Sequence, residues 1–230
     1  MTVNADNDRV LRTSIGDFPL NEYRLKGDGL ECGVLHVNAV LSASEEAEYL
    51  LSPVDRPPYG VALWAASIAL AHEVAARSAE FRGAKVLELG AGTGLPGIAA
   101  ASLGANVTQT DNNLVALHLA RRNLDMNGLK GIEQRQVDWT DWKNTELYHR
   151  IIGSDILYSA EMHPHLRHIF ESNLAPGGRV LLSDPFRASG LKLLEEMEGA
   201  GWTISIGKWT IGDAADARPI GIFELEPPRQ

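Results

Sequence analysis

The chain has 230 residues, enough for one sizeable α/β domain with its own hydrophobic core and too few for two comfortable ones. Its formal net charge of −9 argues against a general grip on nucleic acid, which requires clustered Lys and Arg, and suits a basic protein partner better. Cys32 is the only cysteine, which excludes an intrachain disulfide and a cysteine-rich zinc site. No apolar run has membrane-spanning length, which excludes a transmembrane helix. The first residues are polar and acidic, and together these features indicate the cytoplasm.

The first part of the chain predicts a small extension ahead of the main domain. Residues 1–16 are polar, and we expect a flexible N-terminus there. Residues 17–58 predict the extension, because two short strands flank the turn Gly27-Asp28-Gly29 and form a hairpin pattern. Ser42 and Glu45 then have the spacing of a capping box, which predicts a short helix.

Residues 59–230 predict the main domain, which opens with a helix that is apolar on most of its circumference. Such a helix is expected to pack between a sheet and the N-terminal layer. Trp64 lies near its start. The indole is suited either to shield a cofactor while its N–H donates outward or to fill the core as a plain tryptophan, and the sequence leaves both readings open.

A glycine-rich turn follows, and the rest of the domain is arranged around it. Val86, Leu87 and Leu89 predict a short buried parallel strand, and a helix begins near Leu95. The three glycines between strand and helix, Gly90, Gly92 and Gly94, allow a ligand to approach the backbone closely. Because the helix N-terminus presents free N–H groups, we expect an anionic or carboxylate-bearing cofactor at this turn.

The remaining segments alternate between strand and helix, which predicts a doubly wound parallel sheet with right-handed crossovers. Ligands of such sheets bind at the carboxyl ends of the strands. The predicted strands cover residues 106–111, 132–137, 151–157, 179–183, 202–208 and 220–226, and the predicted helices between them include 161–174 and 191–197, with a Pro-Gly-Gly turn at 176–178.

Four acids end or follow the predicted parallel strands: Glu88, Asp111, Asp138 and Asp155. We expect their side chains to converge on one rim of the sheet. Asp111 is suited to accept hydrogen bonds from a ribose diol, and Asp138 from an adenine amino group, with Trp139 or Asn112 packed on the ring. For each acid taken alone, a helix N-cap or a solvated loop position remains the alternative.

Two cofactor classes compete for the glycine turn. Gly92, Gly94 and Gly97 match the spacing of a dinucleotide fingerprint, with Asp111 at the position of its ribose-binding acid. Glu88 argues the other way, because a carboxylate close to the turn would repel a pyrophosphate and attract a ligand that carries an amino group and a sulfonium. The Glu-x-Gly-x-Gly-x-Gly pattern resembles motif I of class I S-adenosylmethionine (SAM) dependent methyltransferases.

Further motifs extend this resemblance over residues 55–185, to the methyltransferase-like family sixteen, which contains many protein-lysine methyltransferases. The motifs occur in the family's order: Trp64, Glu88-Leu-Gly-Ala-Gly-Thr-Gly-Leu-Pro-Gly-Ile, Asp111, Asp138-Trp139 and Ser154-Asp155-Ile-Leu-Tyr158. More loosely, Asp184-Pro185-Phe186-Arg187 resembles a motif after strand five in flavoprotein-directed members. The chain lacks the Asn-Pro-Pro-Tyr tetrapeptide of enzymes that methylate glutamine or adenine, which further argues against a nucleic-acid substrate.

The resemblance implies a Rossmann-like seven-stranded sheet of order 3-2-1-4-5-7-6 with strand 7 antiparallel. It also implies SAM as cofactor, with S-adenosylhomocysteine (SAH) as product, and Asp155 and Tyr158 beside the methyl acceptor as catalytic residues. The implied cofactor-binding residues are Trp64, Glu88, Gly90, Gly92, Gly94, Asp111, Asn112, Asp138, Trp139 and Asp155.

Four functions therefore stand. A protein methyltransferase, directed at lysine ahead of arginine, comes first. A methyltransferase for a small amine or metabolite is the alternative. A well-closed lid formed by residues 17–58 would favour the small-molecule enzyme, whereas an open acidic groove would favour the protein methyltransferase. A dinucleotide-dependent oxidoreductase and a non-catalytic SAM-binding module follow. A helix face with Glu161, His165 and His168, and with His163 close by, has spacing compatible with a metal. A polar face at the rim is the preferred interpretation, and no metal is assigned.

Overall fold

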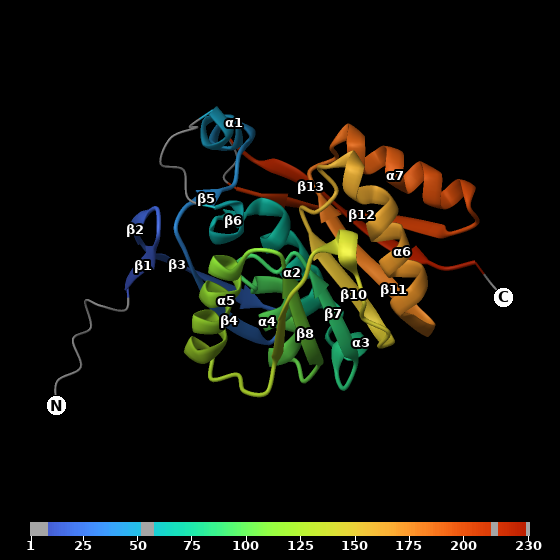
Figure 1. Ribbon diagram of the computed structural model, residues 1–230, viewed down its shortest axis with the longest axis horizontal. Coiled ribbons are helices and arrows are strands. Elements are labelled where there is room, and N and C mark those ends of the chain that lie inside the picture. The colour runs from blue at the N-terminus through green and yellow to red at the C-terminus, as the bar shows by residue number, and fades with distance from the viewer. Residues whose placement is uncertain (1–8, 52–57, 213–215, 229–230) are drawn as a thin grey trace.

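A computed structural model describes residues 9–51, 58–212 and 216–228 (Figure 1). Its centre is a seven-stranded sheet. In spatial order the strands are β12 (Thr203–Ile211), β13 (Arg218–Glu226), β11 (Leu174–Asp184), β10 (Tyr148–Ser154), β7 (Lys85–Leu89), β8 (Asn106–Asp111) and β9 (Glu133–Gln136). Neighbours from β11 to β9 pair in parallel, whereas β13 is antiparallel to both β11 and β12. The predicted order 3-2-1-4-5-7-6 with an antiparallel seventh strand is confirmed.

Helices cover both faces of the sheet, as the doubly wound prediction requires. One face carries α2 (Ala65–Ala76), α4 (Leu95–Ser102) and α5 (Leu114–Met126), and the other carries α6 (His163–Asn173) and α7 (Ala188–Gly199) (Figure 1). The short helix α3 (Ser78–Phe81) connects α2 to β7. The carboxyl ends of the parallel strands are therefore left for loops, and the candidate site lies there.

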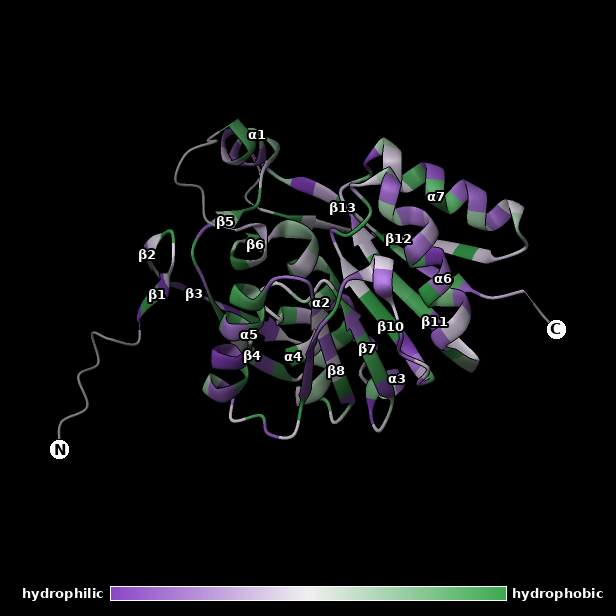
Figure 2. Ribbon diagram, in the orientation of Figure 1, coloured by the Kyte–Doolittle hydropathy of each residue, from purple (hydrophilic) through white to green (hydrophobic). Residues whose placement is uncertain are grey.

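The strand side chains alternate between two hydrophobic clusters, as the period of two in a strand dictates. In β7, Val86 packs with α2 and α4, whereas Leu87 and Leu89 pack with α6 and α7. In β10, Ile152 packs in the cluster of α2 and α4, and Ile151 packs in the cluster of α6 and α7. Figure 2 shows these central strands with many hydrophobic residues and the outer helices with hydrophilic ones. The same alternation decides on which side of β7 the side chain of Glu88 must lie.

The predicted hairpin forms from β3 (Asn21–Gly27) and β4 (Leu30–His36), and it covers α2, α4 and α5 as an additional layer. Asn123 of α5 and Asn127, the residue that follows α5, satisfy the outer edge of β4. Asn123 accepts from the backbone N–H of Leu35 at 2.8 Å and donates to its carbonyl at 3.0 Å. Asn127 does the same with Gly33 at 2.9 and 2.7 Å. These bonds protect the strand edge and fix the extension to the main domain.

The expectation of a flexible N-terminus over 1–16 is wrong for its second half. Residues 1–8 lie outside the described residues, but β1 (Val10–Thr13) pairs with β2 (Gly16–Pro19) in a second hairpin. Leu11 is only 1% exposed, because it packs against α5 in a small cluster of its own. A single buried leucine in a polar stretch gives little sequence signal, which is why the hairpin was missed.

The helix α1 (Ala43–Leu51) forms as predicted, and its capping box is reciprocal. The backbone N–H of Glu45 donates to Ser42 Oγ at 3.2 Å, and Glu45 Oε2 accepts from the Ser42 N–H at 2.8 Å. Residues 52–57, the end of the predicted extension, lie outside the described residues. A parallel pair of short strands, β5 (Ala39–Val40) and β6 (Leu63–Trp64), lies beside α1.

Three predicted boundaries are corrected. Trp64 precedes α2 as the end of β6, after a 3₁₀ turn at Tyr59–Val61, and so does not lie within a helix. The strand β10 ends at Ser154, so Asp155 follows it. The Pro-Gly-Gly segment 176–178 lies inside β11, where the pairing with β10 shifts register. No helix in the described ranges is long and apolar enough to cross a membrane.

Candidate active site

A cavity of about 570 Å³ lies at the carboxyl ends of β7, β8 and β10. It brings together most of the predicted site residues, although they come from distant parts of the chain. Those that line it are Trp64, Gly90, Gly92, Asp111, Asn112, Asp138, Trp139, Asp155 and Tyr158, and the predicted residues that do not line it are Glu88 and Gly94. Side chains that the sequence analysis did not assign also line it: Glu46, Leu50, Tyr59, Ser67, Met162 and Arg187.

The glycine turn forms one wall of the cavity. Gly90 and Gly92 have φ of 64° and 53°, a left-handed conformation that other residues rarely adopt. A Cβ atom on Gly90 would lie 2.9 Å from Ile156 Cγ2, and one on Gly92 would lie 3.3 Å from the carbonyl oxygen of Gly60. Gly94 begins α4 behind this wall. The turn therefore requires glycine for its backbone conformation and for close contacts within the fold.

Asp111, at the end of β8, ties this turn to the next helix. Its Oδ2 accepts from the N–H of Gly92 and its Oδ1 from the N–H of Asn113, each at 2.9 Å. Burial raises the pKa of the Asp111 carboxyl. Each carboxylate oxygen has a second lone pair, so Asp111 can hold the turn and still accept from a ligand hydroxyl. Asn112 follows it, exposed at the rim of the cavity.

Glu88 does not lie on this rim, which corrects the expectation that its carboxylate faces a ligand. Strand alternation directs its side chain, 2% exposed, beneath the first turn of α4. There its carboxylate accepts from the N–H of Gly97 at 2.9 Å and from Gln109 Nε2 at 2.8 Å. Burial raises the pKa of Glu88 to about 7. The carboxylate therefore supports the glycine turn from below.

Asp138 and Trp139 line the same end of the cavity as Asp111 and Asn112. Asp138 caps the 3₁₀ turn Trp139–Asp141, accepting from the N–H and the hydroxyl of Thr140 at 2.8 and 2.7 Å. These bonds lower the pKa of Asp138. The capping role and a ligand contact are compatible, because the residue is exposed at the cavity.

Three aromatic rings lie together beside the cavity. Trp64 meets Tyr49 edge-on, with ring centroids 5.5 Å apart and an interplanar angle of 79°. The indole N–H of Trp64 donates to the carbonyl oxygen of Tyr59 at 3.1 Å. Trp64 therefore packs against a small core cluster and also lines the cavity, and its role in shielding a cofactor stays a prediction.

The same cavity lining carries Asp155 and Tyr158, the predicted catalytic pair. We call the lining around these two residues the acceptor end, and the lining around Gly90, Gly92 and Asp111 the cofactor end. Asp155 follows β10 with φ of 57°, and its side chain forms an ion pair with Arg187. Burial raises the pKa of the Asp155 carboxyl, and the Arg187 charge opposes that shift. Tyr158 is 64% exposed at the cavity mouth. This end therefore presents one carboxylate inside and one phenol outside.

Arg187 is the main functional candidate without an assigned role in the sequence analysis. It also pairs with Glu46 of α1 at 2.5 Å and with Asp184 at 3.3 Å. The loose resemblance at Asp184-Pro185-Phe186-Arg187 was the available signal. The partner Glu46 had none, because 141 residues separate it from Arg187.

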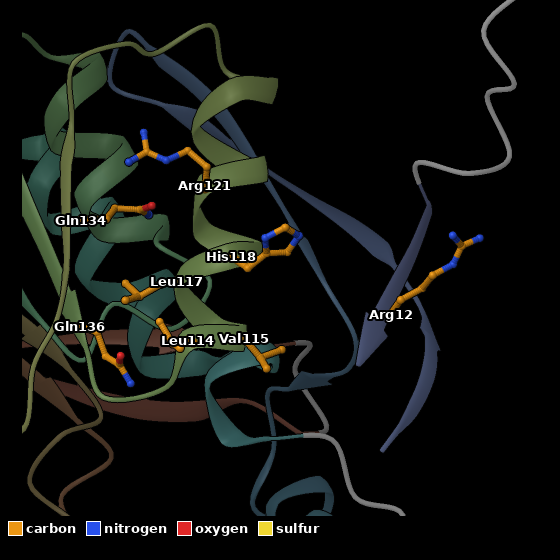
Figure 3. A pocket seen from close by; sticks show the side chains of 8 residues that line it. All are labelled: Arg12, Leu114, Val115, Leu117, His118, Arg121, Gln134 and Gln136. Carbon is orange, nitrogen blue, oxygen red and sulfur yellow. The ribbon is translucent and has the colours of Figure 1, made fainter. Parts of the chain in front are cut away.

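Two other features lie outside this cavity. A second, open hollow of about 590 Å³ lies over α5 and β9; Figure 3 shows Arg121 and Leu117 on the side of α5 toward Gln134, with Arg12 pointing away from the helix. In the predicted histidine face, His163 is buried and its Nε2 contacts the carbonyl oxygen of Leu157 at 3.1 Å. Across the described ranges, no group of three His, Cys, Asp or Glu side chains has metal-binding geometry.

Comparisons with known proteins agree with this arrangement. The model of a lysine methyltransferase family matches residues 55–192. The protein N-lysine methyltransferase METTL21A of Xenopus tropicalis is 35% identical over 129 residues, 54% of this chain and 60% of that protein. EEF1A lysine methyltransferase 3 of Mus musculus is 35% identical over 131 residues, 55% and 56% of the two chains. The matched part thus spans no more than about 60% of the length of these relatives.

Solved structures agree on the fold. A ribosomal protein L11 methylase from Lactobacillus delbrueckii subsp. bulgaricus is 23% identical with a TM-score of 0.57, over 72% of this chain and 80% of that one. The structure titled DhpI-SAH complex is 22% identical with a TM-score of 0.55, over 71% and 86%. Because the family model covers more than half of the chain, this protein belongs to the lysine methyltransferase family.

Proposed function

We propose that this protein is a SAM-dependent protein methyltransferase that transfers a methyl group to the side-chain nitrogen of a lysine and releases SAH. Family membership supports the reaction, and the named activities of METTL21A and EEF1A lysine methyltransferase 3 support a lysine acceptor. The observation that carries the proposal is that one cavity is lined by the glycine turn and Asp111 together with Asp155 and Tyr158. The related DhpI structure contains SAH, which supports the cofactor.

The cofactor end has the groups that SAM requires. Asp111 would accept from the ribose hydroxyls, Asp138 from the adenine amino group, and Asn112 and Trp139 would pack on the base. The described lining contains four carboxylates and a single cation, Arg187, so the cavity favours a cationic ligand. When bound, SAM supplies a methyl group on a cationic sulfur, and the chain has to align the acceptor and exclude water.

At the acceptor end, Asp155 and Tyr158 would orient the amine. A lysine must lose a proton from a pKa near ~10.4 before its nitrogen can attack. Asp155 accepts a hydrogen bond from that nitrogen, and Tyr158 forms a wall with a polar tip. The carboxylate of Asp155 raises the lysine pKa, and apolar neighbours such as Ile156 and Met162 in the lining oppose that rise, so the proton leaves to water.

The mouth of the cavity favours a protein acceptor over a small amine. Leu50, Tyr59 and Tyr158 are 48%, 46% and 64% exposed there, and such a rim suits contact with another macromolecule. The net charge of −9 suits a basic partner. We also propose the cytoplasm as the compartment, which the single cysteine favours and cell fractionation would test.

Calorimetric titration with SAH, and separately with NAD, tests the cofactor. We expect micromolar binding of SAH alone. Binding of NAD alone would overturn the methyltransferase proposal. Labelled SAM added to a lysate then tests the acceptor: a labelled protein band that is stable to base and contains methyl-lysine supports the proposal, whereas label confined to small molecules would support the amine or metabolite alternative.

A further inference from the structure

Five charged side chains form one network of ion pairs, and we call them the charge cluster: Glu46, Asp155, Asp184, Arg187 and Arg218. Glu46, Asp155 and Arg187 line the cavity at its acceptor end. They come from α1, the loop after β10, the end of β11, the residue before α7 and the start of β13. Glu46 joins the two arginines, with Oε1 accepting from Arg187 at 2.5 Å and Oε2 paired with Arg218. The cluster thereby fixes α1 of the extension over the main domain.

The charges of this cluster do not balance. Three carboxylates face two guanidinium groups, so the fully ionised cluster has one negative charge in excess. Burial raises the pKa of both Asp155 and Asp184, as expected where carboxyl groups are crowded out of water. A cation of matching size that reaches the cavity wall would complete the set.

Arg187 has more partners than it needs for its own charge. Its Nη1 pairs with Asp155 and lies 3.3 Å from Asp184 Oδ2, its Nη2 donates to Glu46, and its backbone N–H donates to Asp184 Oδ1 at 2.6 Å. A guanidinium has five N–H donors in a fixed plane, so Glu46 and Asp184 can hold Arg187 when Asp155 turns to another cation.

Resting on the proposed function, we propose that Asp155 exchanges Arg187 for the acceptor ammonium and that Glu46 is the positioning residue for this exchange. Glu46 retains Arg187 at the wall while Asp155 pairs with the incoming lysine. No covalent bond changes in this step; one ion pair replaces another. The extension would thus contribute to acceptor selection through α1, although Glu46 lies 141 residues from Arg187 in the sequence.

The exchange is tested on the SAH-loaded protein, with Nα-acetyl-lysine methylamide as probe and the norleucine analogue, which lacks the amine, as the uncharged control. Affinities are measured by NMR chemical-shift titration up to tens of millimolar probe. We expect the lysine probe to bind and the norleucine probe not to bind. Equal binding of the two probes, or of neither, would overturn the exchange, while retained SAH affinity would leave the proposed cofactor standing.

Variants then test Glu46. Glu46→Gln keeps the size of the side chain and removes its charge. Arg187 then keeps its ion pair with Asp155, so the lysine probe should bind about tenfold more weakly. Glu48→Gln makes the same change at an exposed position of α1 and should leave the affinity unchanged. SAH affinity is measured for each variant and should not move.

Arg187→Gln should change the affinity for the lysine probe in the opposite direction. Removal of the competing cation should strengthen binding of the lysine probe several-fold, which general damage to the fold would not do. In that background the further change Glu46→Gln should have little effect, because Glu46 acts through Arg187. Wild-type affinity in Glu46→Gln, or weakened binding in both single variants, would overturn the positioning role.

Discussion

The two ends of the cavity are built in different ways. At the cofactor end, Gly90, Gly92 and Asp111 lie within one strand–turn–helix–strand segment, and backbone N–H groups hold the carboxylate in place. At the acceptor end, Glu46, Asp155 and Arg187 come from three separate parts of the chain and are held by ion pairs. One end is built from a local segment and held by backbone N–H groups; the other is assembled from distant segments and held by ion pairs.

This difference separates two tasks. Under the proposed function, the cofactor would be bound by a turn whose geometry depends on glycine and on hydrogen bonds to Asp111. The acceptor would be met by side chains that are held by ion pairs. Substitutions should therefore affect SAH binding at one end and acceptor kinetics at the other.

The largest expected effect comes from a substitution that removes the support beneath the cofactor end. In Gly97→Ala the new Cβ overlaps the buried Glu88 carboxylate and approaches Gln109 Nε2 to 2.8 Å. We expect the free energy of unfolding to fall by about 3 kcal/mol, with weaker SAH binding. Chemical denaturation measures this loss. Gly199→Ala, where nothing lies within 4 Å of the added atom, is the control; similar losses in both would contradict the packing argument.

Asp155→Asn should break the acceptor end alone. Asparagine tolerates a positive φ, so the backbone at this position is kept, but the charge that attracts and orients the amine is lost. We expect kcat/KM for the methylated protein to fall by about 100-fold, with unchanged SAH affinity. Asp141→Asn, at an exposed position, is the control. Unchanged turnover together with unchanged SAH affinity would remove Asp155 from this role.

Asp111→Asn should weaken the cofactor end and leave the acceptor end unchanged. The neutral amide keeps one acceptor oxygen, so either Gly92 or Asn113 loses its acceptor, and ribose hydroxyls lose a carboxylate. The SAH dissociation constant should rise about tenfold, while KM for the acceptor at saturating SAM stays the same. Calorimetry and steady-state kinetics measure the two quantities, with Asp125→Asn on α5 as control. A changed acceptor KM would mean that the ends are not independent.

The smallest expected effect, taken per pH unit, is a pH dependence beneath the glycine turn. The pKa of Glu88 is raised from 4.5 to about 7, so between these values the native state holds a proton that the unfolded state releases. The free energy of unfolding should therefore fall as pH rises through this window, by at most ~1.4 kcal/mol per pH unit. Urea denaturation across the window measures this slope.

Glu88→Gln should make that slope less negative, and the exposed Glu198→Gln should leave it as in the wild type. The variant also loses one acceptor for Gly97 or Gln109, which lowers stability at every pH without changing the slope. An unchanged slope in Glu88→Gln would mean that its carboxyl is ionised throughout.

Most of the fold could be predicted because its signals are short in sequence. The glycine turn, the alternation of strands and helices and the capping box of Ser42 and Glu45 each act within a few residues, where local geometry decides the outcome. The β1–β2 hairpin could not be predicted in this way, since its stability comes from packing of Leu11 on α5. The predicted strand 151–157 extends beyond Ser154, where β10 ends, and therefore does not show the left-handed conformation of Asp155.

Within the candidate site, sequence alone determined the glycine turn, the acid at the end of β8 and the acids that follow β9 and β10, because strand order brings the carboxyl ends of parallel strands together. Only the tertiary structure decided that Glu88 lies beneath the turn, since strand alternation and the packing of α4 direct its side chain away from the rim. It also decided that Arg187 pairs with both Asp155 and Glu46, because contacts over 32 and 141 residues form only when the chain has folded.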